Sequence, residues 1–186
     1  LVGCLAKAGH QVTGVDVNES LIKNLQSGIV TWNEPGLTEL LAQNNDKISF
    51  QASYQGAFET SEISFVIVPT PSTQSGEFSN EFVLEVVTRI GNELATRARK
   101  EHLVVIVSTV MPGSTQGVIK KTLLKAASAN SDLVQICYSP EFIALGTVIK
   151  NMEYPDLVLI GQETDSAGQM LEDISLSMVK NQPKVS

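Results

Sequence analysis

Basic residues, cysteine and long apolar runs are all scarce in this sequence. Its 186 residues include 13 Lys and Arg against 20 Asp and Glu, which gives a net charge of −7. Arg97, Arg99 and Lys100 form the densest basic cluster, so we expect no binding to a nucleic-acid backbone. The longest aliphatic run, residues 103–107, is far shorter than the roughly 20 residues that a membrane span needs. Apolar residues still make up 42% of the chain, enough for a packed core.

Cysteine occurs only as Cys4 and Cys137, too far apart for a Cys-x-x-Cys pair. This spacing excludes zinc ribbons and paired redox sites. His10 and His102 have no His, Cys or Asp neighbour at ligand spacing, so no metal site is predicted. We expect a reduced, cytoplasmic protein, without a signal peptide because no basic segment precedes an apolar run.

Predicted strands and helices alternate along the chain. The strands fall at 11–16, 48–52, 63–68, 102–107, 133–138 and 157–160, and the helices at 1–8, 20–26, 37–42, 54–60, 81–99, 116–129 and 165–179. The near-continuous apolar character of 63–68 and 102–107 is typical of parallel strands covered on both faces. The sequence therefore predicts an α/β fold with a doubly wound, Rossmann-like parallel sheet.

Polar loops follow several of these strands. Ligands bind beside the carboxyl ends of strands in open α/β sheets, so these loops form the candidate site. They are Asp16-Val17-Asn18, Val68-Pro69-Thr70-Pro71, residues 108–115 and Ser139-Pro140-Glu141-Phe142.

Asp16 ends the first predicted strand of the chain. In dinucleotide-binding folds, an acidic residue at the end of the second strand binds the adenosine ribose and favours NAD over NADP. The glycine-rich fingerprint would then lie roughly 20 residues earlier, before Leu1, and Gly3 alone cannot replace it. The alternative is that Asp16 is an ordinary turn residue.

The other loops also have two interpretations each. Thr70, between two prolines, either lines a cofactor or simply follows a strand end. The hydroxyl-rich segment 108–115 precedes a helix and suits an anion, although Ser114 alone could cap that helix. Glu141 is either a general base with a raised pKa or an ordinary surface carboxylate.

Taken in order, the motifs resemble the UDP-glucose/GDP-mannose dehydrogenase family. They are Asp16-Val17-Asn18-Glu19, Asn33-Glu34-Pro35-Gly36-Leu37, Val68-Pro69-Thr70-Pro71, residues 108–115, Ser139-Pro140-Glu141-Phe142, Tyr154-Pro155-Asp156 and Ile160-Gly161. The resemblance covers nearly the whole chain. It implies that residues 1–186 are part of an NAD-binding domain, and that the first strand, the glycine-rich loop, the central dimerisation helix and the C-terminal nucleotide-sugar domain lie outside it.

The resemblance also implies an activity and roles for individual residues. The family oxidises the C6 alcohol of a nucleotide sugar to the carboxylate with NAD, through a thioester on a cysteine of a later domain. Asp16 would hold the adenosine ribose, while Val68, Thr70, Pro71 and Ser108 would line the cofactor. Thr109 would position the reacting region, Glu141 would be the base for thioester hydrolysis, and Phe142 with Ile143 would contact the nucleotide sugar.

Two departures and two alternatives accompany this interpretation. Neither Cys4 nor Cys137 matches the family's nucleophile, and Leu145 precedes Gly146 where the family often has an acidic residue. Without the nucleophile and the glycine-rich loop, we expect the 186 residues alone to be inactive. The resemblance also implies that the full-length parent is a homo-oligomer. The alternatives are another NAD-dependent hydroxyacid dehydrogenase, for which no Lys or His–Asp pair is evident, and a non-catalytic nucleotide-binding module.

Overall fold

A computed structural model describes residues 1–74 and 76–186, which divide into two compact units. The first unit comprises Leu1–Ser53, Phe142–Val158 and Glu172–Ser186. The second comprises Tyr54–Glu141 and Leu159–Leu171. Among the helices of the described residues, none is both long enough and apolar enough to cross a membrane.

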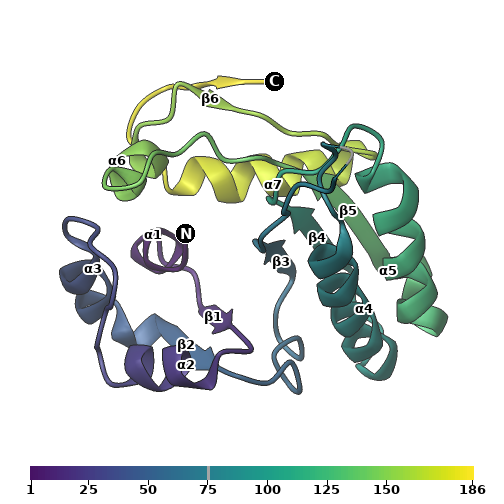
Figure 1. The fold of residues 1–186 in the computed structure, drawn as a ribbon, viewed down its shortest axis with the longest axis horizontal. Coiled ribbons are helices and arrows are strands. Elements are labelled where there is room, and N and C mark those ends of the chain that lie inside the picture. The colour runs from purple at the N-terminus through teal and green to yellow at the C-terminus, as the bar shows by residue number, and fades with distance from the viewer. Residues whose placement is uncertain (75) are drawn as a thin grey trace. The chain divides into compact units, whose positions relative to one another are not determined.

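The first unit holds two small parallel sheets and the helices around them (Figure 1). Strand β1 pairs with β2 so that Val12 lies opposite Ile48, and β6 pairs with β7 so that Leu157 lies opposite Lys184. Its elements are α1 (Val2–Lys7), β1 (Val12–Val15), α2 (Glu19–Gln26), α3 (Leu37–Gln43), η1 (Asn45–Lys47), β2 (Ile48–Gln51), α6 (Val148–Glu153), β6 (Leu157–Val158) and β7 (Lys184–Val185). The sequence did not predict the last strand.

A buried carboxylate joins three segments of the first unit. Glu153, at the end of α6, accepts from Lys7 Nζ at 2.5 Å and from Lys180 Nζ at 2.6 Å. Burial acts to raise the pKa of Glu153, but the hydrogen bonds from the two lysines outweigh it and hold that pKa below its usual value. The contacts tie α1 and the C-terminal segment to α6.

The second unit is built on a three-stranded parallel sheet in the order β3, β4, β5. Its elements are β3 (Ile63–Val66), α4 (Glu81–Thr96), β4 (His102–Ile106), η2 (Thr115–Ile119), α5 (Lys120–Ala127), η3 (Ser128–Leu133) and β5 (Val134–Tyr138). Helix α7 (Asp165–Ser177) begins in this unit and ends in the first one. The prediction of parallel strands with flanking helices is confirmed, although the strands form separate sheets instead of one continuous sheet.

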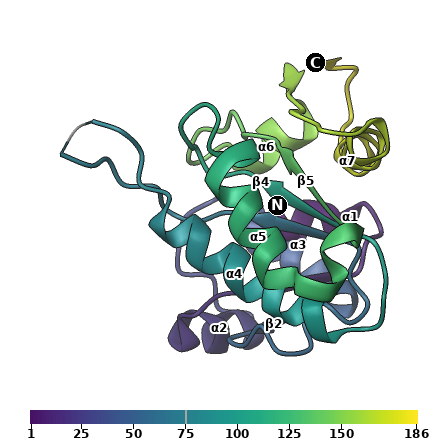
Figure 2. The ribbon, with the colours of Figure 1, turned by 90° about the vertical axis from the view of Figure 1, so that its right-hand side faces the viewer.

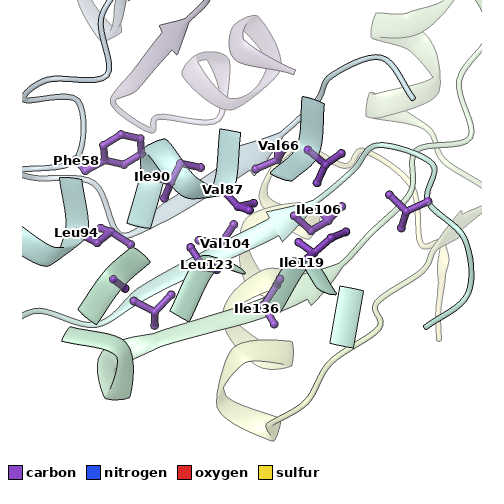
Figure 3. Packing of buried hydrophobic residues seen from close by; sticks show 14 residues of the cluster. Phe58, Val66, Val87, Ile90, Leu94, Val104, Ile106, Ile119, Leu123 and Ile136 are labelled. Atoms are coloured by element: carbon purple, nitrogen blue, oxygen red, sulfur yellow. The ribbon is translucent and has the colours of Figure 1, made fainter. Parts of the chain in front are cut away.

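The core of the second unit lies between its sheet and helices α4 and α5. Side chains alternate along a strand, so Val104 and Ile106 join this core while Leu103 and Val105 lie on the other face, where they are also buried. Figure 3 shows the packing of the cluster, whose labelled members are Phe58, Val66, Val87, Ile90, Leu94, Val104, Ile106, Ile119, Leu123 and Ile136. Burial on both faces explains the uninterrupted apolar run of β4.

Helices α4 and α5 lie side by side (Figure 2), and Gly91 allows their close approach. A Cβ built on Gly91 would lie 2.5 Å from the Cβ of Ala126 and 2.8 Å from the carbonyl oxygen of Leu123. Real Cβ atoms do not come this close to a backbone oxygen, so any larger residue would push the helices apart.

We therefore expect Gly91→Ala to destabilise the chain by up to about 2 kcal/mol. Overpacking costs about 1–3 kcal/mol, and the better helix propensity of Ala returns about 1 kcal/mol. Thermal unfolding would show the loss as a melting temperature lowered by several degrees. Asn92→Ala, at the next and exposed position of α4, is the control, and equal melting temperatures for the two variants would contradict the packing role.

The predicted helix at 54–60 is wrong, because the segment forms successive turns. Ala57 N–H donates to Tyr54 O, Glu59 N–H donates to Gly56 O, and Gly56 has a left-handed φ of +75°, which interrupts a helix. The end of this segment is held by the side chain of Arg97. Its guanidinium donates to the carbonyl oxygens of Phe58, Ser61, Lys100 and Glu101 at 2.7–3.1 Å.

The ends of other predicted strands and helices differ from the structure by a few residues. The strand predicted at 63–68 ends at Val66, and the strand predicted at 157–160 ends at Val158. The helix predicted at 116–129 is split into η2, one turn of π-helix with non-helical backbone angles at Gly117, and α5. Gly9 has the left-handed φ that its position after α1 predicts, +104°.

Candidate active site

Three polar loops of the second unit follow the carboxyl ends of neighbouring strands. Val68, Thr70 and Pro71 follow β3, Ser108 and Thr109 follow β4, and Ser139 to Glu141 follow β5. Because the three strands are parallel and adjacent, these loops leave the same edge of the sheet. The structure therefore brings six predicted residues to that edge, namely Val68, Thr70, Pro71, Ser108, Thr109 and Glu141.

Ser108 links the first two loops through its side chain. Its buried hydroxyl accepts from Val68 N–H at 2.8 Å and lies 2.8 Å from Val68 O, to which it donates. The hydroxyl is thus used to hold the backbone just ahead of Thr70 and Pro71. Thr70 is half-buried and Pro71 is exposed.

The loop after β4 leads into η2 without the predicted helix cap. Ser114 makes no side-chain capping bond; its hydroxyl instead accepts from Asn80 Nδ2 at 3.1 Å. Asn80 directly precedes α4, and sequence reasoning missed it because a polar residue before a helix is usually read as a cap. Its Oδ1 is buried without a hydrogen-bond partner among the described residues. Thr109 is exposed at the start of the same loop.

Glu141 is half-buried just beyond β5. Burial raises the pKa of its carboxyl group above the ordinary value for glutamate. Ser139 N–H donates to Ile106 O at 2.9 Å, which extends the β4–β5 pairing toward the Pro140-Glu141 segment. Partial burial with a raised pKa is the environment in which catalytic acids and bases are found.

Asp16 lies in the first unit, at the carboxyl end of β1. Its Oδ1 accepts from Asn18 N–H at 2.8 Å, and Asn18 in turn caps α2 by accepting from Leu21 N–H. The Asp16 side chain is exposed, so its carboxylate is open to solvent and able to accept further hydrogen bonds.

Phe142 and Ile143 also belong to the first unit. Their side chains are 64% and 42% exposed, far above what apolar residues of a packed core show, so they are available for contact with a ligand. Neither these two residues nor Asp16 shares a compact unit with the loops that follow β3, β4 and β5. Among residues 1–74 and 76–186, no group of three or more His, Cys, Asp or Glu residues could hold a metal ion.

Comparison with known proteins identifies the family. Residues 1–178 match the model of the UDP-glucose/GDP-mannose dehydrogenase family, NAD binding domain. The chain belongs to this family. The predicted family resemblance is therefore confirmed.

Named relatives of the UDP-glucose/GDP-mannose dehydrogenase family agree with the match. UDP-glucose 6-dehydrogenase AglM of Haloferax volcanii is 32% identical over 182 residues, which are 97% of this chain and 42% of that protein. GDP-mannose 6-dehydrogenase of Pseudomonas aeruginosa is 31% identical over 175 residues, 92% of this chain and 40% of that protein. The chain thus spans about two fifths of the length of these relatives.

Solved structures of the same family share the fold. A ternary complex of GDP-mannose dehydrogenase from Pseudomonas aeruginosa matches all of this chain and 43% of its own, with a TM-score of 0.91 at 29% identity. A UDP-glucose dehydrogenase from Pyrobaculum islandicum matches 99% of this chain and 42% of its own, with a TM-score of 0.91 at 28% identity. The cofactor of the matched domain is NAD.

The position and exposure of Asp16 fit the binding of NAD. An exposed carboxylate at the end of β1 is the group that accepts hydrogen bonds from ribose hydroxyls in dinucleotide-binding folds. Asp16 is such a group, because its Oδ1 accepts from Asn18 N–H while the carboxylate remains exposed to solvent.

Proposed function

We propose that this chain is the NAD-binding part of a nucleotide-sugar 6-dehydrogenase that oxidises a UDP-glucose-like substrate. The observation that carries the proposal is the family match over residues 1–178, which spans every loop of the candidate site. Relatives named for UDP-glucose and for GDP-mannose are nearly equally similar, at 32% and 31% identity. The choice of sugar therefore rests on the test below.

The proposed reaction converts the C6 alcohol to a carboxylate with two NAD⁺ and one water, and yields two NADH and three protons. NAD, when bound, accepts a hydride in each of the two oxidation steps. Asp16 would hold the ribose of the cofactor, while Val68, Thr70, Pro71 and Ser108 would shape the wall beside it. Phe142 and Ile143, exposed in the loop before α6, would contact the nucleotide sugar.

Two residues would act closest to the reaction. Thr109, exposed at the carboxyl end of β4, would orient the reacting group. Glu141 would accept a proton from the water that cleaves a thioester to the nucleophilic cysteine of the full-length enzyme. Its raised pKa supports this role, because a base works best with a pKa near the working pH.

The test is NADH formation by the full-length protein with UDP-glucose, and in parallel with GDP-mannose. The proposal expects two NADH for each sugar oxidised and faster turnover with UDP-glucose. A single NADH for each substrate molecule would indicate another hydroxyacid dehydrogenase. NAD binding without any NADH formation would indicate the non-catalytic nucleotide-binding module.

Asp16→Asn should weaken the preference for NAD over NADP about tenfold in kcat/KM. The amide keeps an oxygen for Asn18 N–H, so the turn is preserved, but it removes the charge that binds ribose hydroxyls and repels a 2′-phosphate. Loss of one charge-assisted hydrogen bond is worth about 1.5–3 kcal/mol. The control is Glu19→Gln, which removes a neighbouring exposed carboxylate, and an NAD/NADP ratio equal to that of the control would refute the assignment of Asp16.

A further inference from the structure

A hydrogen bond between distant segments joins Glu34 to helix α6. Glu34 Oε1 accepts from Ile149 N–H at 3.1 Å, across 115 residues of sequence. Glu34 is half-buried in the turn before α3, and Ile149 is the second residue of α6. Both belong to the first unit.

Helix α6 has no capping bond from the residue that normally supplies one. The hydroxyl of Thr147, the residue before the helix, donates to Ala144 O at 3.2 Å and accepts from Asn151 Nδ2 at 3.3 Å. Glu34 therefore provides the acceptor for an N–H of the first turn that would otherwise lack an intrahelical partner. Its negative charge also suits the positive end of the helix.

The rest of α6 is held by the body of the first unit. Val148 and Ile149 pack against the buried cluster of Cys4, Leu40 and Met152. At the other end, Glu153 binds Lys7 and Lys180. The first turn of α6 is thus held by this packing together with the bond to Glu34, and the last turn is held by the two lysines.

The segment that leads into that first turn carries the proposed substrate contacts. Phe142, Ile143 and Leu145 are 64%, 42% and 96% exposed, so burial of these apolar side chains contributes little to holding the segment. A turn from Thr147 N–H to Ala144 O, at 3.1 Å, connects it directly to α6. The position of residues 142–147 therefore depends on how firmly the start of α6 is held.

We propose that Glu34 is a positioning residue for nucleotide-sugar binding. It caps α6 from a distance and so fixes the segment that carries Phe142 and Ile143. The inference rests on the proposed function, since the ligand of that segment is the nucleotide sugar. Glu34 itself contacts no substrate atom in this role.

The test compares Glu34→Ala, Glu34→Gln and Glu39→Ala in the full-length protein. Loss of the cap weakens the start of α6, so Glu34→Ala should raise the KM for UDP-glucose about tenfold, with kcat and the KM for NAD unchanged. Glu34→Gln keeps a carbonyl oxygen for Ile149 N–H and should restore most of the binding. Glu39, exposed in the first turn of α3, is the matched control and should behave as the unaltered protein.

Amide hydrogen exchange provides a readout that does not depend on activity. The Ile149 amide should exchange faster in Glu34→Ala than in Glu39→Ala. Faster exchange with an unchanged KM for UDP-glucose would overturn the positioning role while leaving the proposed function intact. A fall in kcat together with a rise in both KM values would also overturn it, because Glu34 would then support the fold as a whole. Failure of the unaltered protein to oxidise any nucleotide sugar would instead refute the proposed function.

Discussion

Glu141→Gln should slow turnover of the full-length enzyme by about 10²–10⁴-fold, the usual contribution of a general base. The substitution keeps the size of the side chain and removes its ability to accept a proton. Glu141 follows β5 at the edge shared by the loops after β3 and β4, and burial raises its pKa. Proton transfer to a carboxylate in this environment is more favourable than to an exposed one.

The timing of the effect identifies the step. If Glu141 activates the water that hydrolyses a thioester, the variant should complete the oxidation and then accumulate a covalent acyl adduct. Intact-mass spectrometry after one turnover would detect that adduct. Glu101→Gln, at the opposite end of the same sheet just before β4, is the control and should turn over normally.

The pH profile gives a second measure of the same group. The basic form of Glu141 is the active one, so turnover should rise with pH at a higher pH than an ordinary glutamate would produce. A slow variant without an adduct would place Glu141 before the thioester. Unchanged turnover would mean that the carboxylate has no part in the reaction.

Acidification should destabilise the second unit through His102, by an amount on the order of 3 kcal/mol between neutral pH and pH 4. The imidazole is 2% exposed. Its Nδ1–H donates to Ser61 O at 3.3 Å, because a carbonyl can only accept, and Nε2 then accepts from the Ser64 hydroxyl at 2.7 Å. The ring is thus buried in its neutral form.

The direction of the effect follows from the pKa in each state. Burial, followed by the positive charges of Arg97 and Lys100, lowers the pKa of His102 from 6.5 to about 4, although the Ser61 carbonyl opposes this. The unfolded chain therefore takes up a proton below about pH 6.5, whereas the folded chain does so only near pH 4. The contribution of His102 to the free energy of unfolding is therefore fully present above about pH 6.5 and is lost as the pH falls from about 6.5 to about 4.

Urea unfolding at a series of pH values would measure this loss. His102→Gln lacks the titrating group, so its stability should fall less between pH 7 and pH 4, whatever its stability at pH 7. His10→Gln, which alters the half-buried histidine of the first unit, should keep the full dependence on pH. Parallel curves for the two variants would be inconsistent with a buried neutral His102.

The strands of the second unit were predictable because each is a short apolar run with clear ends. His102–Ile106 is buried at every position, and a strand covered on both faces has the same apolar signature wherever it occurs. The residues after such strands were predictable for the same reason, since parallel topology collects them at one edge.

Other features depend on contacts that local patterns do not contain. Residues 54–60 have a helix-like composition, but the left-handed Gly56 prevents a continuous helix. The hydroxyl of Ser108 binds the backbone of Val68, a contact between two loops that the local sequence does not indicate. Gly91 has no special signal inside α4, because the reason for it lies on α5. The hydrogen bond from Ile149 N–H to Glu34 joins residues 115 positions apart, so no periodic pattern in the sequence indicates it.

Arg97 has a consequence for how this protein can evolve. It binds four main-chain oxygens, and a carbonyl is present whatever side chain its residue carries. Ser61, Lys100 and Glu101 can therefore be substituted without loss of these hydrogen bonds. Phe58 is the exception, because its side chain also belongs to the core. These three positions should therefore tolerate substitution. Arg97 itself cannot be replaced even by lysine, because the single side-chain nitrogen of lysine cannot reach all four acceptors.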